Sequence, residues 1–303
     1  MGNTHMSRDK LVSIEQAASL VRDGDLVALQ NMASQIAPMA MVRELIRQRR
    51  RNLGLICILG GIPVDWLAAA GVIDRFLGPA VSMEQFGLCQ QFRRGVESGR
   101  LKMIEVAEGA LLTMLGAATR GLPFLPSKSM IGTDLIALNP DLFRMIDDPF
   151  GGTPLVACRA LTPDVALIHA HMADRAGNVQ IDAGPVWPDL GIMPKAARRV
   201  IVTVEEIVES DVLRRNPDRT VIPGFVVDAL VHVPHGAHPT SLFPRYGYDA
   251  AMHHAWADCA KDDAAAVEFI DRHIIQPANQ SAYLEAAGGA DMLATIARWG
   301  APA

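Results

Sequence analysis

The sequence contains few aromatic residues. They make up 5% of its 303 positions, although half of the positions are hydrophobic. Ala, Val, Leu and Ile supply most of the apolar residues, which suits packed layers of helices and sheet better than an aromatic-rich β-sandwich. There is also no run of 18 apolar residues, so we expect no transmembrane helix and no membrane partner. No signal-peptide pattern is seen, and a cytoplasmic location is the simplest expectation.

An excess of basic charge is likewise absent. Lys and Arg total 28 against 33 for Asp and Glu, which gives a net charge of −5 with His neutral. Such a chain has no overall field that would attract nucleic acid, and we expect no nucleic-acid partner. One basic run, at residues 47–51, follows a helical pattern. It most simply marks a solvated helix end, where the helix dipole favours cations; the alternative is contact with an anionic ligand.

Several motifs of common enzyme classes are missing. The four cysteines are widely spaced and form no C-x-x-C, so neither a disulfide framework nor a zinc site is expected. There is no G-x-S-x-G, no P-loop and no G-x-G-x-x-G, which removes support for α/β-hydrolases, P-loop NTPases and Rossmann dehydrogenases. We expect His169 and His171 to point to opposite faces of a strand, one of them toward solvent or a site. Because no further ligands lie at a suitable spacing, no metal site is predicted.

What is present is an alternation of helix and strand patterns. Ser13 and Gln16 have capping-box spacing at the start of a helix. Apolar runs then predict strands at 25–29, 53–59, within 72–82 and at 101–106, with helices at 38–49, 63–70 and 108–120 between them. This order predicts an α/β fold with a mostly parallel sheet covered by helices on both faces.

The second half continues the pattern. Strands are predicted at 165–170, 200–204 and 226–233, and a helix at 205–213. The Pro- and Gly-rich region 121–154 shows no clear periodicity, and we expect an ordered, loop-rich insertion. From about residue 249 the spacing predicts two or three C-terminal helices. We interpret residues 1–5, which precede a second methionine, as a cloning remnant and residues 6–303 as one domain.

Polar residues follow the third and fourth predicted strands. Ser82, Glu84, Gln85 and Phe86 come directly after one strand, and the carboxyl ends of parallel strands are where open α/β sheets bind ligands. Glu84 is therefore a candidate substrate-facing group, with helix capping as the alternative.

Glu105 and Glu108 follow the next strand and open a helix. Two carboxylates at this spacing could perform acid–base chemistry or simply cap the helix. Further candidates lie in loops. Thr133 and Asp134 follow a glycine and could contact an acyl group, or Asp134 could cap a turn.

Four segments together resemble the alpha subunit of heteromeric family I CoA-transferases of the glutaconate CoA-transferase type, a group that includes related ring-cleaving CoA hydrolases. They are LPFLP followed by GTD (122–134), DPFGG (148–152), DVALIHAHMADRAGNVQ (164–180) and PHGAHP (234–239). The resemblance runs from about Val12 to Tyr248. It implies a three-layer α/β sandwich, shared with certain sugar-phosphate isomerases, extended here by C-terminal helices.

The resemblance also implies a reaction, a partner and site residues. A beta subunit, in an αβ or α2β2 assembly, would carry a nucleophilic glutamate that attacks an acyl-CoA thioester. The resulting glutamyl-CoA would pass CoA to a carboxylic acid, with CoA thioester as substrate and no cofactor. Glu108 matches an E-x-x-E-G glutamate required in the ring-cleaving hydrolases. The usual glycine-rich turn after the first strand is replaced by residues 30–35, where Asn31 or Ser34 could substitute.

Two other functions stay open. A CoA-thioester or ring-cleaving hydrolase would use Glu108 or water in place of a glutamyl-CoA intermediate. A non-catalytic acyl-CoA-binding subunit would keep the same motifs as scaffolding.

Overall fold

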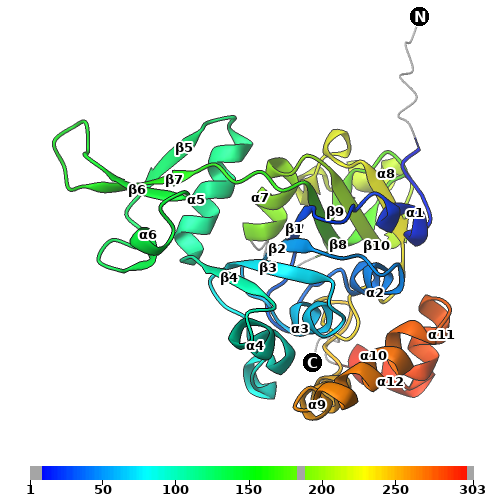
Figure 1. The fold of residues 1–303 in the computed structure, drawn as a ribbon. Coiled ribbons are helices and arrows are strands. Elements are labelled where there is room, and N and C mark those ends of the chain that lie inside the picture. The colour runs from blue at the N-terminus through cyan, green and yellow to red at the C-terminus, as the bar shows by residue number, and fades with distance from the viewer. Residues whose placement is uncertain (1–8, 183–187, 299–303) are drawn as a thin grey trace, which may run out of the picture.

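The computed structural model describes residues 9–182 and 188–298 (Figure 1). Its centre is a nine-stranded sheet. The parallel part has the spatial order β12 (Ala229–His232), β10 (Val200–Ile207), β8 (Val165–Ala173), β1 (Leu26–Leu29), β2 (Leu53–Ile56), β3 (Ile73–Gly78) and β4 (Lys102–Glu105). Two short strands, β9 (Val179–Gln180) and β11 (Thr220–Ile222), continue antiparallel from the end of β8. The predicted mostly parallel α/β sheet is confirmed.

The central strands are buried on both faces. Every residue of β2 is buried, as are the last three of β1. Within β1, Val27 and Leu29 belong to one hydrophobic cluster and Ala28 to the other, so alternate side chains enter different cores. This is why the strands appear in the sequence as continuous apolar runs.

Helices cover the two faces and complete three layers. One face packs against α1 (Ile14–Ser19), α2 (Met39–Arg47), α3 (Ile62–Ala69) and α4 (Gln90–Glu97). The other packs against α5 (Glu108–Thr119) and α7 (Pro188–Ala196). The capping box of α1 is confirmed: Ser13 Oγ accepts from the Gln16 amide at 3.2 Å, and Gln16 Oε1 accepts from the Ser13 amide at 3.0 Å.

The C-terminal segment forms α9 (Ala250–Cys259), α10 (Asp263–Ile270), α11 (Gln280–Ala286) and α12 (Gly289–Ala297), with a π-helical turn over Asp271–Ile275. These are four α-helices where two or three were expected. Of these, α9 and α10 dock on α3, where the Trp256 ring lies edge-on to Trp66 at 6.2 Å and its Nε1–H donates to the buried Asp65 carboxylate at 2.9 Å.

Residues 121–154 are ordered and rich in loops, as predicted, and they also contain short regular elements. Together with the following segment they form a three-stranded antiparallel sheet, β5 (Phe124–Ser127), β7 (Leu155–Arg159) and β6 (Phe143–Ile146), with the short helix α6 (Leu135–Leu138). The strands are four or five residues long, and one carries Pro126 at the sheet edge. Such short elements leave little periodicity for a sequence pattern to reveal.

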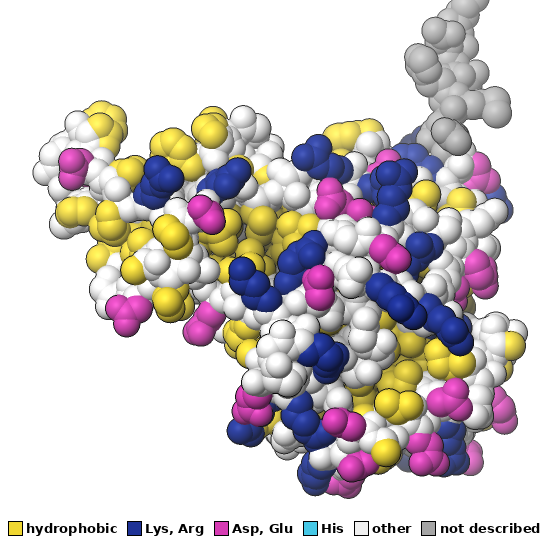
Figure 2. Space-filling model, in the orientation of Figure 1, with side chains coloured by type: hydrophobic (Ala, Val, Ile, Leu, Met, Phe, Trp, Pro, Cys, Tyr) yellow, Lys and Arg dark blue, Asp and Glu magenta, His cyan; other side chains and the backbone are white. Residues whose placement is uncertain are grey.

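This small sheet forms a lobe that projects from the main body (Figures 1 and 2). Half of the exposed large hydrophobic side chains of the described residues lie in it or its loops: Leu122, Phe124, Ile131, Leu138, Met145 and Phe150. Figure 2 shows apolar side chains over the lobe and in the hollow between it and the body. Contiguous exposed apolar surface is typical of sites that contact another molecule.

One element prediction is wrong, and one predicted strand has a displaced start. The predicted helix 205–213 begins as strand, because β10 continues to Ile207 and only α8 (Ser210–Arg214) is helical. The predicted strand 226–233 starts late, at Ala229, after a 3₁₀ turn over Gly224–Val226. In the described part of the chain, no helix combines the length and the apolar character needed to cross a membrane.

Candidate functional site

The loops that follow β1, β2 and β3 lie side by side at the carboxyl edge of the sheet. The Ala33 amide donates to the Leu59 carbonyl at 3.0 Å, and the Ser82 amide donates to the Gly60 carbonyl at 2.8 Å. Gly61 allows this approach, since a Cβ there would lie 2.4 Å from the Ala33 carbonyl oxygen. The loops after β1, β2 and β3 are thus hydrogen-bonded to one another in series and form one continuous surface at this edge.

Two predicted site residues contact each other on the surface formed by these loops. Ser34 Oγ, which is buried, donates to the exposed Glu84 carboxylate at 3.0 Å. Glu84 begins a 3₁₀ turn (Glu84–Phe86) with a φ of 53°, and its amide donates to Ser82 Oγ at 3.0 Å. A glutamate in the left-handed region is strained by about 1–3 kcal/mol, and strain of this kind collects at functional sites. Ser34, Ser82 and Glu84 therefore form a fixed group.

The loop after β1 also adopts left-handed backbone conformations, although it contains no glycine. Ala33 and Ile36 have φ values of 52° and 49°. Asn31 is fully buried, and its side-chain amide donates to the Ala33 carbonyl at 2.9 Å and the Gln35 carbonyl at 3.3 Å. Asn31 thus supports the turn that presents Ser34, and its contact with a substrate stays a prediction.

Phe86 has aromatic neighbours that the sequence did not suggest. Its ring stacks on His253 at 4.7 Å and meets Tyr248 edge-on at 5.6 Å. His254 of α9 lies 5.0 Å away. The helical tail thus contributes side chains beside the strand-end loops, while Gln85 stays exposed next to Glu84.

The second group of predicted residues lies at the end of β4. Glu105 and Glu108 are both exposed, and the Glu105 carbonyl accepts from Asn139 Nδ2 at 3.3 Å. A Cβ on Gly109 would lie 3.2 Å from Ser129 Oγ, which places the lobe's loop against the start of α5.

Thr133 and Asp134 sit in that loop. Both are exposed; Thr133 Oγ1 donates to the Met130 carbonyl at 2.8 Å, and Asp134 precedes α6 without a capping hydrogen bond from its side chain. The structure thus brings Glu105, Glu108, Thr133 and Asp134 to one region. The carboxylates of the three acidic residues are open to water.

The strongest polar cluster is one that sequence reasoning missed. The Glu205 carboxylate accepts from the Tyr246 hydroxyl at 2.6 Å, the His235 amide at 2.7 Å and His169 Nε2 at 2.8 Å. Burial alone would raise the pKa of Glu205, but these donors and the charge of His169 outweigh it and lower the pKa to about 2. No local signal marks Glu205, because its partners come from β8 and from residues 235–246.

The two histidines of the H-x-H pair correct another expectation. His169 and His171 lie on the same face of β8, since residues two apart share one face of a strand, and both are buried. His171 Nε2 lies 2.9 Å from the Phe243 carbonyl, and burial lowers the pKa of its imidazole. In residues 9–182 and 188–298, no cluster of three or more His, Cys, Asp or Glu could hold a metal ion.

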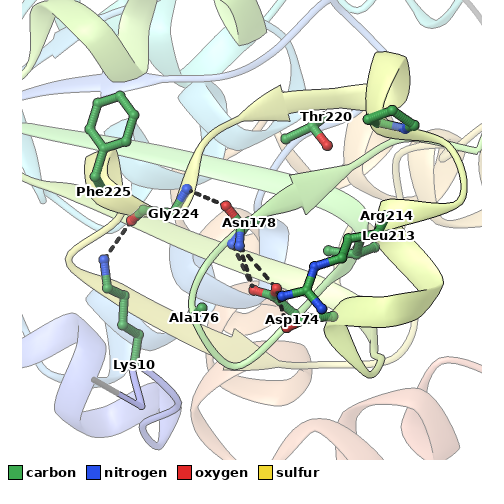
Figure 3. Close-up of a pocket in the computed structure, with 11 residues that line it drawn as sticks. Lys10, Asp174, Ala176, Asn178, Leu213, Arg214, Thr220, Gly224 and Phe225 are labelled. Atoms are coloured by element: carbon green, nitrogen blue, oxygen red, sulfur yellow. Dashed lines mark hydrogen bonds between the residues drawn. The ribbon is translucent and has the colours of Figure 1, made fainter. Parts of the chain in front are cut away.

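A pocket of about 600 Å³ lies elsewhere and contains none of the predicted site residues (Figure 3). Its polar groups already have partners. Asp174 accepts from the Asn178 amide at 2.9 Å and from Ser210 Oγ at 2.7 Å, while Lys10 Nζ donates to the carbonyls of Gly224 and of Val227, the latter at 2.6 Å. The D-R-A-G-N segment (174–178) therefore closes a turn.

Comparison with known proteins gives consistent matches. The family model described as "Coenzyme A transferase" matches residues 11–233. An uncharacterized protein of Archaeoglobus fulgidus is 35% identical over 96% of this chain, which spans 65% of that longer protein. A 3-oxoadipate CoA-transferase subunit of Pseudomonas knackmussii is 34% identical over 88% of this chain and 93% of its own.

Two further matches concern a different reaction and a solved fold. The cholesterol ring-cleaving hydrolase IpdA subunit of Rhodococcus jostii is 29% identical over 88% of this chain and 93% of its own. The crystal structure of glutaconate coenzyme A-transferase from Acidaminococcus fermentans superposes with a TM-score of 0.88. It is 30% identical and covers 95% of each chain.

Proposed function

Because this chain belongs to the coenzyme A transferase family, we propose that it is the alpha subunit of a two-chain enzyme that moves CoA between an acyl-CoA and a carboxylic acid. One observation carries the proposal. The carboxylate of Glu84, which the buried Ser34 hydroxyl fixes, and the carboxylates of Glu105 and Glu108 lie at the carboxyl edge of the sheet and are exposed to solvent in this chain. Thioester chemistry needs an enclosed site with preorganised donors, so a second polypeptide must close this one.

The nucleophile in this proposal is a glutamate of the partner. Its carboxylate attacks the thioester carbonyl and CoA leaves as thiolate, which then attacks the glutamyl carbonyl and releases the first acid. The acceptor acid takes CoA by the reverse steps, so one thioester is consumed and one formed. The present chain binds and orients the acyl group, with Ser34, Glu84 and Phe86 as the wall nearest to it.

Other features support a partner. Two of the relatives named above are described as subunits, a word that implies at least one further chain in those enzymes. The lobe exposes six large apolar side chains, and its loop lies next to Glu108. A partner seated over the carboxyl edge would therefore also lie close to this apolar surface.

The test is reconstitution with the partner, identified by co-purification from the native source. Purified alone, the chain should show no CoA exchange between a labelled carboxylic acid and an acyl-CoA. The assembled enzyme should exchange CoA, and borohydride should trap a glutamyl thioester on the partner. Full exchange by the isolated chain would refute the proposal.

A hydrolase is the second candidate, favoured by the exposed Glu108 beside Glu105 and by the similarity to the ring-cleaving hydrolase of Rhodococcus jostii. Glu108 would then act as general base toward water or substrate. Hydrolysis of the thioester or ring without any trappable glutamyl thioester would select this function. Acyl-CoA binding without turnover, even in the assembled complex, would instead identify a non-catalytic binding subunit.

A further inference from the structure

The buried carboxylate of Glu205 takes no part in the proposed reaction, yet it is among the most fully bonded groups in the molecule. Its side chain is 7% exposed. Besides Tyr246, His169 and the His235 amide, the Gly236 amide donates to it at 3.1 Å. A carboxylate that accepts four donors is held in one position, and it holds the donors in turn.

Two of those donors are backbone amides of the P-H-G-A-H-P segment. His235 has a φ of 55°, and a Cβ on Gly236 would lie 2.6 Å from the His169 ring. Glycine is therefore required where the segment passes the imidazole. The Gly236 carbonyl then accepts from the Ala40 amide at 2.9 Å, which ties the segment to the first turn of α2. Glu205 thus fixes the path of the chain after β12.

The residues that follow this segment, 240–241, are hydrogen-bonded to the loop after β1. The Ser241 amide donates to the Ser34 carbonyl at 3.0 Å, and the Ser241 carbonyl accepts from the Ile36 amide at 2.8 Å. Thr240 Oγ1 accepts from the Ala37 amide at 3.1 Å. Residues 34–37 are therefore paired with residues 240–241, so the position of Ser34 depends on the position of this segment.

We propose that Glu205 is a positioning residue, which fixes residues 235–241 and through them sets where the Ser34 hydroxyl meets Glu84. The argument that this matters for turnover rests on the proposed function, in which Ser34 and Glu84 line the acyl pocket. The positioning itself rests on the hydrogen bonds alone. It acts through the backbone of two loops, and Glu205 touches no substrate.

The test compares Glu205→Gln with Asp164→Asn by amide hydrogen exchange of the intact chain. Glutamine keeps the size of the side chain but turns an NH₂ group toward the donors of His235 or Tyr246. Asp164 is the matched control, since its Oδ2 accepts one amide hydrogen bond, from Leu26 at 2.8 Å, at the start of β1. Glu205→Gln should speed exchange about tenfold in peptides covering 235–241, 32–37 and 82–87, and Asp164→Asn should leave all three unchanged.

Two outcomes overturn the proposal: faster exchange confined to 235–241, or equal effects in both variants. If Glu205→Gln does not fold, Tyr246→Phe removes one donor to Glu205 together with the acceptor of the Ala237 amide, and the faster exchange in 32–37 and 82–87 should then appear more weakly. In the assembled enzyme, kcat should fall at least tenfold in Glu205→Gln and stay unchanged in Asp164→Asn. Amide hydrogen exchange is measured without turnover. A wild-type complex that fails to transfer CoA would therefore refute the proposed function without changing the result on positioning.

Discussion

The Glu205 cluster predicts how stability should depend on pH. Hydrogen bonds and the charge of His169 lower the pKa of this carboxyl from 4.5 to about 2, against the opposing effect of burial. A carboxyl whose folded pKa is lowered contributes stability above its unfolded pKa and loses it as pH falls through the folded pKa. The difference corresponds to about 3 kcal/mol at neutral pH, lost progressively between about pH 5 and pH 2.

Glu205→Gln removes the ionisable group and with it this contribution. Urea unfolding of the variant and the wild type should therefore differ by about 3 kcal/mol at pH 7, and the difference should shrink steadily below pH 5. Comparing the two proteins at each pH cancels the carboxylates they share. The titratable residues around position 205 that both proteins share are His169, His235 and Tyr246. Burial raises the pKa of Tyr246, so its hydroxyl stays neutral over this range. A difference that is the same at pH 7 and pH 3.5 would refute the reasoning.

Three other predictions concern the site loops, the carboxylate at β4 and the helical tail. Gly61→Ala places a Cβ against the Ala33 backbone and should lower the free energy of unfolding in urea by about 1–3 kcal/mol. The control Gly191→Ala lies in α7, where an added Cβ meets no atom within 4 Å, and it should raise that free energy by about 0.5–1 kcal/mol. Equal effects of the two substitutions would contradict the packing argument. Glu108→Gln should leave CoA exchange of the assembled enzyme within about tenfold of wild type if the partner supplies the nucleophile, and a loss of 100-fold or more would favour the hydrolase. Tyr283→Phe leaves the buried His238 Nδ1, now bonded at 2.9 Å, without its partner, and should cost about 1–3 kcal/mol in the same unfolding assay; an unchanged midpoint would show that the contact contributes little.

The sheet could be predicted because its strands are largely apolar and buried on both faces, such as β2 (Leu53–Ile56) and β8 (Val165–Ala173). The exception at residues 205–213 has a physical reason. A pair of glutamates is uncommon in a strand, and Glu205 is tolerated there only because four donors satisfy its carboxylate. Three of these donors lie thirty or more residues further along the chain, so no local pattern could reveal them.

The candidate site divides in the same way. Parallel strands bring their carboxyl ends to one edge, so residues chosen for following strands, such as Ser34 and Glu84, were found in contact. That rule says nothing about what supports them. Asn31, predicted to face a substrate, is buried in its own turn, while His253 beside Phe86 comes from a helix about 170 residues later. Strand order therefore predicts which side chains can reach a ligand, but the residues that fix their positions come from long-range packing, which only the structure reveals.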